Sequence, residues 1–116
     1  MNVDALANQL LVKMAGPDFR YLELRSGKQP KTCEHRNRSR LLCKIPFDDN
    51  GEINNKYGLV LEAGTIGHFR IVGKRRKVMM QGDVGTTKRS AFRMDHVRVE
   101  AGQQIWITQF KINFGG

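Results

Sequence analysis

The chain has 116 residues, of which 40% are hydrophobic and 27% are charged, and its formal net charge is +9. This length fits a single domain, residues 1–116, with one core, and this composition excludes a disordered chain. We find no apolar run near the roughly 20 residues of a membrane-spanning helix and no secretory signal pattern. We therefore expect a cytoplasmic protein without a membrane partner.

The first predicted element is a short N-terminal helix over residues 2–15. Its apolar residues recur at helical spacing and form one stripe, made of Val3, Leu6, Leu10, Leu11 and Met14. Asn2 is a suitable N-cap, and Gly16-Pro17 ends the helix. Because so short a helix is only marginally stable alone, we expect it to dock on the rest of the domain.

The remaining chain, residues 18–114, is predicted to be a β domain. Residues 19–25 and residues 41–47 alternate between two faces, as strands do. Between them, residues 26–39 are polar and basic and include glycine and proline. Such a stretch predicts a long, mobile loop, and loops of this length often carry function.

Turn signals divide the second half of the chain into further strands. Asn50-Gly51 is typical of a tight hairpin, because both residues readily adopt positive φ angles. Residues 82–90 are rich in Gly and Thr and predict a second mobile loop. The strands around these turns are predicted at residues 57–61, 66–72, 74–81, 92–100 and 104–114.

The last predicted strand has an almost wholly apolar face, which should line the core and consists of Trp106, Thr108, Phe110, Ile112 and Phe114. In total the pattern predicts about six or seven strands with closely spaced turns. This indicates an all-β fold, or a β-rich α+β fold if the helix is counted, arranged as an antiparallel barrel or sandwich. An OB-like barrel is one candidate, although the helix that such barrels insert between their third and fourth strands is not evident.

The most informative motif is a basic hairpin that joins two of these strands. Five of the eight residues from Arg70 to Lys77 are basic, namely Arg70, Lys74, Arg75, Arg76 and Lys77. Adjacent cations repel one another, so they are best tolerated where they are solvated or meet an anion. We predict that the hairpin tip projects beyond the sheet and contacts a phosphate backbone. An ordinary solvated tip, or an edge strand protected by lysine, is the alternative.

The long loop offers a second basic element. Arg36, Arg38 and Arg40 alternate with polar residues, and in an extended chain they would lie on one side at a spacing close to the phosphate repeat of a single strand. A disordered basic loop is the alternative. Lys88 and Arg89, from the second loop, complete the predicted set of phosphate-binding cations.

Aromatic residues beside cations would complete a single-strand site, because exposed rings stack on bases. Tyr21 follows Arg20 and Tyr57 follows Lys56, and a phenol tolerates contact with water. We therefore predict that Tyr21 or Tyr57 stacks on bases, although strand aromatics more often belong to the core.

Metal binding and catalysis have weaker signals. Cys33, His35 and Cys43 offer three zinc ligands, but their spacing is not that of the usual closely spaced cysteine pairs, and Cys43 should point into the core. Whether these residues bind a metal stays open. No phosphate-binding loop and no nucleophile with an orienting base is evident, so we expect no cofactor and no enzyme activity.

These observations predict a non-enzymatic protein that binds nucleic acid largely independently of sequence, through the basic hairpin and the basic loop. Single-stranded DNA or RNA is favoured over duplex, since no helix is available to enter a major groove. The alternative is a structural subunit of a phage or viral particle, or of another assembly, whose basic residues face the genome or acidic partners. For such a structural subunit, the expected location of the protein is the virion. An RNA-cleaving enzyme is a third candidate, and a homo-oligomer is compatible with either of the first two.

Overall fold

The structure, a computed structural model, describes residues 18–33, 39–53, 55–87 and 89–107. The predicted helix over residues 2–15 lies outside the described residues, as does the last predicted strand beyond Ile107. The described chain consists of β-strands joined by turns and loops, which confirms the all-β class. Among its elements, none is a helix with the length and apolar character needed to cross a membrane.

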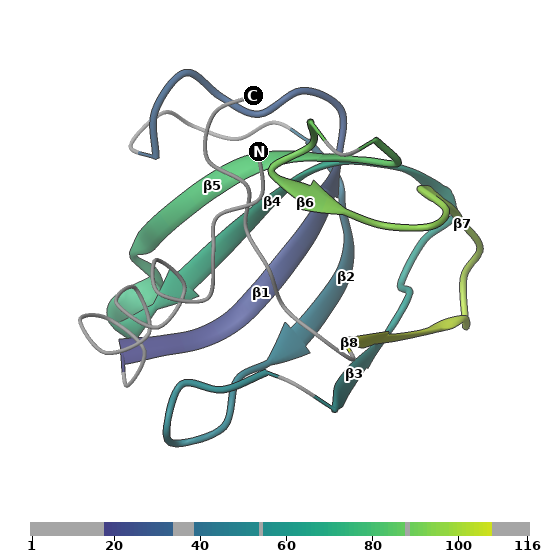
Figure 1. The fold of residues 1–116 in the computed structure, drawn as a ribbon. Helices are drawn as coiled ribbons and strands as arrows, with labels where there is room; N and C mark the ends of the chain where they lie inside the picture. The colour runs from purple at the N-terminus through teal and green to yellow at the C-terminus, as the bar shows by residue number, and fades with distance from the viewer. Residues whose placement is uncertain (1–17, 34–38, 54, 88, 108–116) are drawn as a thin grey trace.

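Six strands form the main sheet. Five follow one another in the order β2-β1-β4-β5-β6, and all neighbours are antiparallel except β5 and β6. The sixth, β7, pairs with the first residues of β4. The bounds are Phe19–Ser26 for β1, Leu41–Pro46 for β2, Gly64–Gly73 for β4, Val78–Gly85 for β5, Phe92–Arg93 for β6 and Arg98–Val99 for β7. Figure 1 shows the long strands β1, β2, β4 and β5 side by side.

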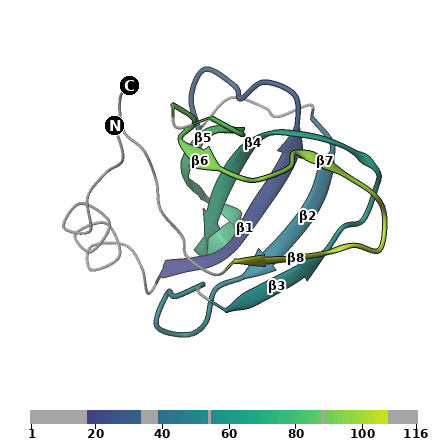
Figure 2. The same ribbon diagram turned by 45° about the vertical axis from the view of Figure 1, so that its right-hand side comes forward.

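Two further strands, β3 (Lys56–Leu59) and β8 (Gln104–Ile107), form an antiparallel ribbon beside β2. The ribbon joins the main sheet through a single bridge between Cys43 and Val60. Figures 1 and 2 show that the chain from β6 to β8 passes across one face of the main sheet. The described strands form no closed barrel, so the fold is an open, curved sheet with a second layer across it.

The hydrophobic core lies between the main sheet and this second layer. Strand alternation and register place apolar side chains in rows on the inner face. One row consists of Ile45, Leu22, Ile71 and Met80. The next row includes Cys43, Leu24 and Phe69, all fully buried. The second layer supplies Phe92, whose ring meets the ring of Phe69 edge-on with centroids 6.0 Å apart.

The outer face of the main sheet is polar and is covered by the loop after β1. Four side chains of the sheet donate hydrogen bonds to loop carbonyls: His68 Nδ1 to Gly27 (2.8 Å), Gln81 Nε2 to Pro30 (2.6 Å), Arg70 Nη2 to Cys33 (2.9 Å) and Arg25 Nη1 to Ser39 (3.0 Å). These bonds hold the described part of the loop against the sheet, and the mobility expected for residues 26–39 stays a prediction.

Three sequence predictions about element bounds need correction. Residues 82–85 belong to β5, so the second predicted loop is shorter than residues 82–90. The predicted strand over residues 92–100 is two short strands, β6 and β7, with a bend between them. Lys74–Arg76 form a short 3-10 turn, η2, so the strand predicted over residues 74–81 begins only at Val78.

Candidate nucleic-acid interface

Strand order and register bring several exposed side chains to one end of the molecule, which we call the turn end. Phe19 at the start of β1 pairs with Gly73 at the end of β4, next to η2. Because β1 and β2 are antiparallel, β2 also ends here, and Lys56 at the start of β3 pairs with Ile107 at the end of β8. In Figure 1 the turn, the start of β1, the end of β2 and the ribbon follow one another along the lower side.

The turn between β4 and β5 places two arginines in the left-handed backbone region. Arg75 has φ 59° and ψ 27°, and Arg76 also has φ 59°. The N–H of Lys77 donates to the carbonyl of Lys74 at 3.1 Å, which closes a two-residue hairpin turn of the type I′ kind. Asn and Gly are favoured at these positions, and the left-handed conformation costs other residues roughly 1–2 kcal/mol each. The sequence therefore keeps two arginines where two smaller residues would fold better.

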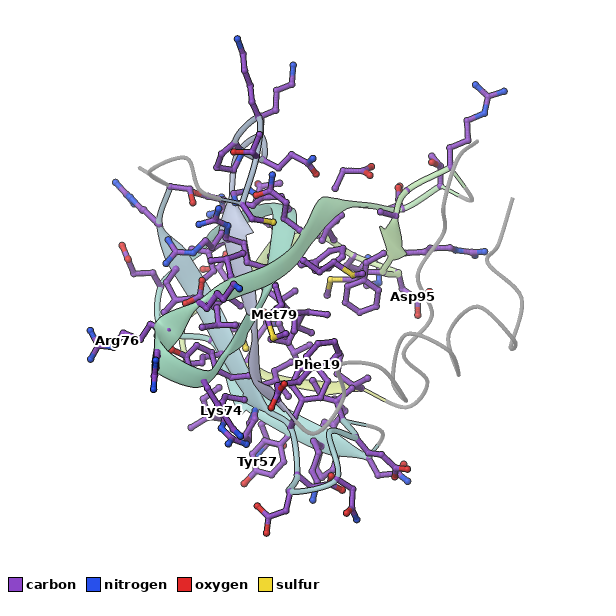
Figure 3. The ribbon with its side chains drawn as sticks, turned by 90° about the vertical axis from the view of Figure 1, so that its left-hand side faces the viewer. Phe19, Tyr57, Lys74, Arg76, Met79 and Asp95 are labelled. Carbon is purple, nitrogen blue, oxygen red and sulfur yellow. The ribbon has the colours of Figure 1, made fainter. Side chains whose placement is uncertain are left out.

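The side chains of this turn project into solvent. Figure 3 shows Arg76 pointing away from the body of the protein, with Lys74 below it. Lys74 Nζ lies 3.3 Å from Asp18 Oδ1, and both side chains are at least half exposed, so this ion pair is weak. Arg75, Arg76 and Lys77 are exposed, and no described carboxylate lies within ion-pair distance of them. This tip carries the highest local density of unneutralised charge among the described residues.

The ribbon contributes an exposed aromatic pair. Tyr57 and Trp106 are register partners on β3 and β8, and their rings stack with centroids 4.6 Å apart and planes 29° from parallel. Tyr57 is 45% exposed and Trp106 is 54% exposed. The prediction that Trp106 faces the core is wrong, because Ile105 and Ile107 face inward on this strand instead. Within β8, Gln104 and Trp106 share the exposed face and Ile105 and Ile107 share the inner one, whereas the other residues on which the prediction rested lie beyond Ile107, outside the described residues.

Beside Trp106 lies an open hollow of about 420 Å³. It is formed between β8 and the segment that joins β6 to β7, and its polar lining includes Arg93, Asp95, His96, Arg98 and Gln104. Arg98 Nε lies 3.6 Å from Glu100 Oε1 in an exposed pair, whereas no ion pair forms at Arg93 within the described chain. Arg93, Arg98 and Trp106 are thus among the residues that line one hollow.

The remaining predicted contact residues are placed differently. Arg70 is only 6% exposed, and its guanidinium is used by Cys33 and Gln81, so it is not available to a phosphate. Tyr21 is half-buried, and Lys44 Nζ lies 3.8 Å above its ring. Arg40 is exposed and pairs with Glu62 at 3.4 Å. Arg89 is exposed, and Arg36, Arg38 and Lys88 lie outside the described residues.

The described parts of the basic loop lie away from the β4–β5 turn, while Arg36 and Arg38 lie outside the described residues. The loop after β1 leaves the sheet at the end opposite the turn end, and Figure 1 shows it at the top while the β4–β5 turn lies at the lower left. The turn end also holds the acidic hairpin after β2. There Asp48 Oδ1 accepts hydrogen bonds from the N–H groups of Asn50 and Glu52, while Asp49 and Glu52 are exposed. The exposed cations of the tip and the exposed acids of this hairpin therefore lie at the same end of the molecule (Figure 1).

The residues that the sequence offers for metal or thiol chemistry are Cys33, His35 and Cys43. Among the described residues no group of three or more His, Cys, Asp or Glu side chains is placed to hold a metal ion. Cys43 is fully buried, and burial raises the pKa of its thiol to about 11, which opposes the thiolate that zinc or a nucleophile needs. Cys43 acts as a small core side chain, as the sequence predicts. His35 lies outside the described residues.

Comparison with known proteins identifies no relative: no protein-family model, no curated protein and no solved structure matches the chain. Any function must therefore be inferred from the charge, exposure and geometry described above.

Proposed function

We propose that the protein binds nucleic acid and catalyses no reaction on it. The observation that carries this proposal is the β4–β5 turn, where Arg75, Arg76 and Lys77 project without acidic partners among the described residues. Backbone strain at exposed positions persists where the side chains serve a purpose other than folding. A row of solvated cations on a rigid tip suits a polyanion with regularly spaced phosphates.

We favour single-stranded DNA or RNA over duplex as the ligand. Two exposed aromatic rings lie at the same end of the sheet as the cationic tip, and single-strand binders combine these two features. Such binding depends on phosphates and ring faces, so it should be largely independent of sequence and sensitive to salt. The cytoplasmic location expected from the sequence belongs to this proposal.

The decisive experiment removes charge from the tip while improving its fold. In the double variant Arg75→Asn/Arg76→Gly, two cations are lost and the turn gains the residues that its geometry favours. We expect weaker binding to a labelled single strand, and a log–log salt slope reduced by about 1.4, since each phosphate contact contributes about 0.7. Fluorescence anisotropy over a salt series measures both quantities.

The matched control removes two exposed cations from the opposite end of the sheet, in the variant Lys28→Ala/Lys31→Ala. It lowers the net charge by the same amount, so a general charge effect would weaken binding equally in both variants. We expect the control to keep nearly all of the wild-type slope. Equal loss in the two variants, or no loss in the turn variant, would contradict a binding role for the tip.

A structural subunit of a larger assembly is the second candidate, and one observation favours it. The ribbon exposes three large apolar side chains, Tyr57, Leu59 and Trp106, and Leu61, two residues after β3, is exposed as well. In addition, β8 pairs with β3 on one side and with no second strand among the described residues, which leaves an edge for another chain. Light scattering of the nucleic-acid-free protein over a range of concentrations separates the candidates. A subunit forms large particles, and a binder stays a monomer or small oligomer.

A further inference from the structure

We infer that Trp106, supported by Tyr57, is a stacking platform for an unpaired base, and that the adjacent hollow receives the nucleotide that carries this base. This inference rests on the proposed function and specifies the form of nucleic acid that is recognised. The sequence assigned Trp106 to the core, and only the register of β3 and β8 reveals its exposure.

The platform is held in place before any ligand arrives. Strand pairing sets Trp106 opposite Tyr57, and the two rings stack at 4.6 Å. The indole N–H donates to Gln104 Oε1 at 3.2 Å, which satisfies its polar edge and limits rotation of the ring. A ring whose orientation is already fixed loses little conformational entropy when a base stacks on it.

The exposure of these rings is not needed for folding. Burying an aromatic side chain of this size is among the largest hydrophobic contributions that a residue makes, yet Trp106 is 54% and Tyr57 is 45% exposed. The inner face of the ribbon is already filled by Ile105 and Ile107, which pack with the core. Contiguous exposed apolar surface of this kind marks an interaction site.

The surrounding charge favours a nucleotide over an apolar protein surface. Arg93 and Arg98 line the hollow together with Trp106. A third cation, Lys56, directly precedes Tyr57 in β3. Asp95 and Glu100 are the nearby acids, and Glu100 is already paired with Arg98. Arg93 lines the same hollow and forms no ion pair within the described chain, so it is the cation that we expect to meet a phosphate.

The size of the hollow agrees with this assignment. Its volume of about 420 Å³ lies within the range of roughly 300–1,000 Å³ that small-ligand sites occupy. Aromatic stacking needs a free base face, and duplex bases already stack on their neighbours. The platform should therefore discriminate single strands from duplexes, whereas the cationic tip contacts phosphates of either form.

The chain contains one tryptophan, so its intrinsic fluorescence reports on this site alone. We would titrate the full chain at low salt with oligothymidine, with a matched duplex, and with inorganic polyphosphate, which carries charge but no bases. Oligothymidine should quench the fluorescence as it binds. Duplex and polyphosphate should bind, as shown by displacement of a labelled oligonucleotide, and leave the fluorescence nearly unchanged.

Variants test the same point independently of fluorescence. Trp106→Leu should weaken binding of labelled oligothymidine roughly tenfold, within the range measured for single stacking contacts, and leave polyphosphate binding unchanged. Trp106→Phe keeps a ring and should recover most of the affinity. Leu59→Ala is the matched control, because Leu59 is 51% exposed on the same ribbon but offers no ring to a base.

The outcomes separate the two proposals. If no nucleic acid binds even at low salt, the proposed function fails. If oligothymidine binds normally while Trp106→Leu has no effect and the fluorescence does not change, the function stands and the stacking platform is wrong. If Trp106→Leu and Leu59→Ala instead reduce self-association of the free protein, the ribbon is a protein interface and the inference is overturned.

Discussion

Arg70 Nη2 donates a hydrogen bond of 2.9 Å to the carbonyl oxygen of Cys33, which joins the centre of the main sheet to the loop after β1. The same guanidinium donates to Gln81 Oε1, and Gln81 in turn donates to the carbonyl of Pro30. A cation that the sequence places in a phosphate-binding hairpin is thus used inside the protein, where it donates to the Cys33 carbonyl of the loop and to the Gln81 side chain.

Arg70→Met tests this structural role, since methionine retains part of the apolar volume and has no donor. The Cys33 carbonyl and the Gln81 side chain would each lose a partner, and hydrogen bonds from charged groups contribute roughly 1.5–3 kcal/mol. We expect the free energy of unfolding in urea to fall by about 2 kcal/mol. The salt slope for oligonucleotide binding should not change, and a lower slope at unchanged stability would show that Arg70 contacts phosphate after all.

His68 should make stability depend on pH. The side chain is fully buried and its Nδ1–H donates to the Gly27 carbonyl. Burial lowers the pKa of His68, as do the charges of Arg25 and Arg70, while the bond to Gly27 and the charge of Glu23 act in the opposite direction.

The sign follows from the two states of His68. The unfolded chain binds a proton near the ordinary pKa of about 6.5, whereas the folded chain resists protonation until a lower pH. The contribution of His68 is therefore complete above about pH 6.5 and is lost as the pH falls toward the folded pKa, at up to about 1.4 kcal/mol per pH unit.

Urea unfolding between pH 7.5 and 5 measures this effect. His68→Gln should remove most of the dependence, and His96→Gln, at an exposed histidine, should leave it intact. A wild-type stability that is flat over this range would contradict the assignment.

The turn variant Arg75→Asn/Arg76→Gly should be more stable than the wild type. Both positions have φ 59°, where Asn and Gly are favoured, and the two replacements also remove repulsion among four adjacent cations. We expect the free energy of unfolding to rise by about 1–2 kcal/mol. Thermal unfolding at low and high salt measures the gain, and a loss of stability would show that the arginines themselves support the fold.

Gly58 should tolerate no side chain, because it sets how closely the ribbon approaches β2. A Cβ atom at this position would meet the carbonyl oxygen of Lys44, and backbone cannot move aside as a side chain can. We expect Gly58→Ala to lower the free energy of unfolding by about 2–3 kcal/mol, as overpacking does. Gly64→Ala is the control, since its new Cβ would meet only the side chain of Leu42. An equal loss of unfolding free energy in Gly58→Ala and Gly64→Ala would contradict this explanation.

Local patterns in the sequence predicted several elements well. The strands near residues 19–25 and 41–47 were predicted because their alternation is a local property, and the burial of Cys43 follows from it. The β4–β5 turn and the exposure of its cations were predicted from charge, since four adjacent cations cannot be buried together. The left-handed conformation of the turn was not predicted, because no sequence rule places arginines at positive φ.

The prediction failed where a choice depended on residues far away in the chain. Trp106 and Ile107 are both apolar, and only the layer that packs on one side of β8 determines which of them is buried. From the sequence, Arg70 is predicted to be a free cation, whereas in the folded protein it donates a hydrogen bond to the loop after β1. In each case the missing information is a contact between distant segments.

The amino-acid sequence alone determines that this chain is basic, strand-rich and marked by a cationic hairpin, because charge and strand period are properties of neighbouring residues. Long-range strand pairing determines which of the described cations remain in water, which aromatic rings stay exposed, and that the described part of the loop after β1 lies away from the β4–β5 turn (Figure 1). The physical reason is that exposure is a property of the folded surface: a side chain is free to meet a ligand only when no other segment covers it.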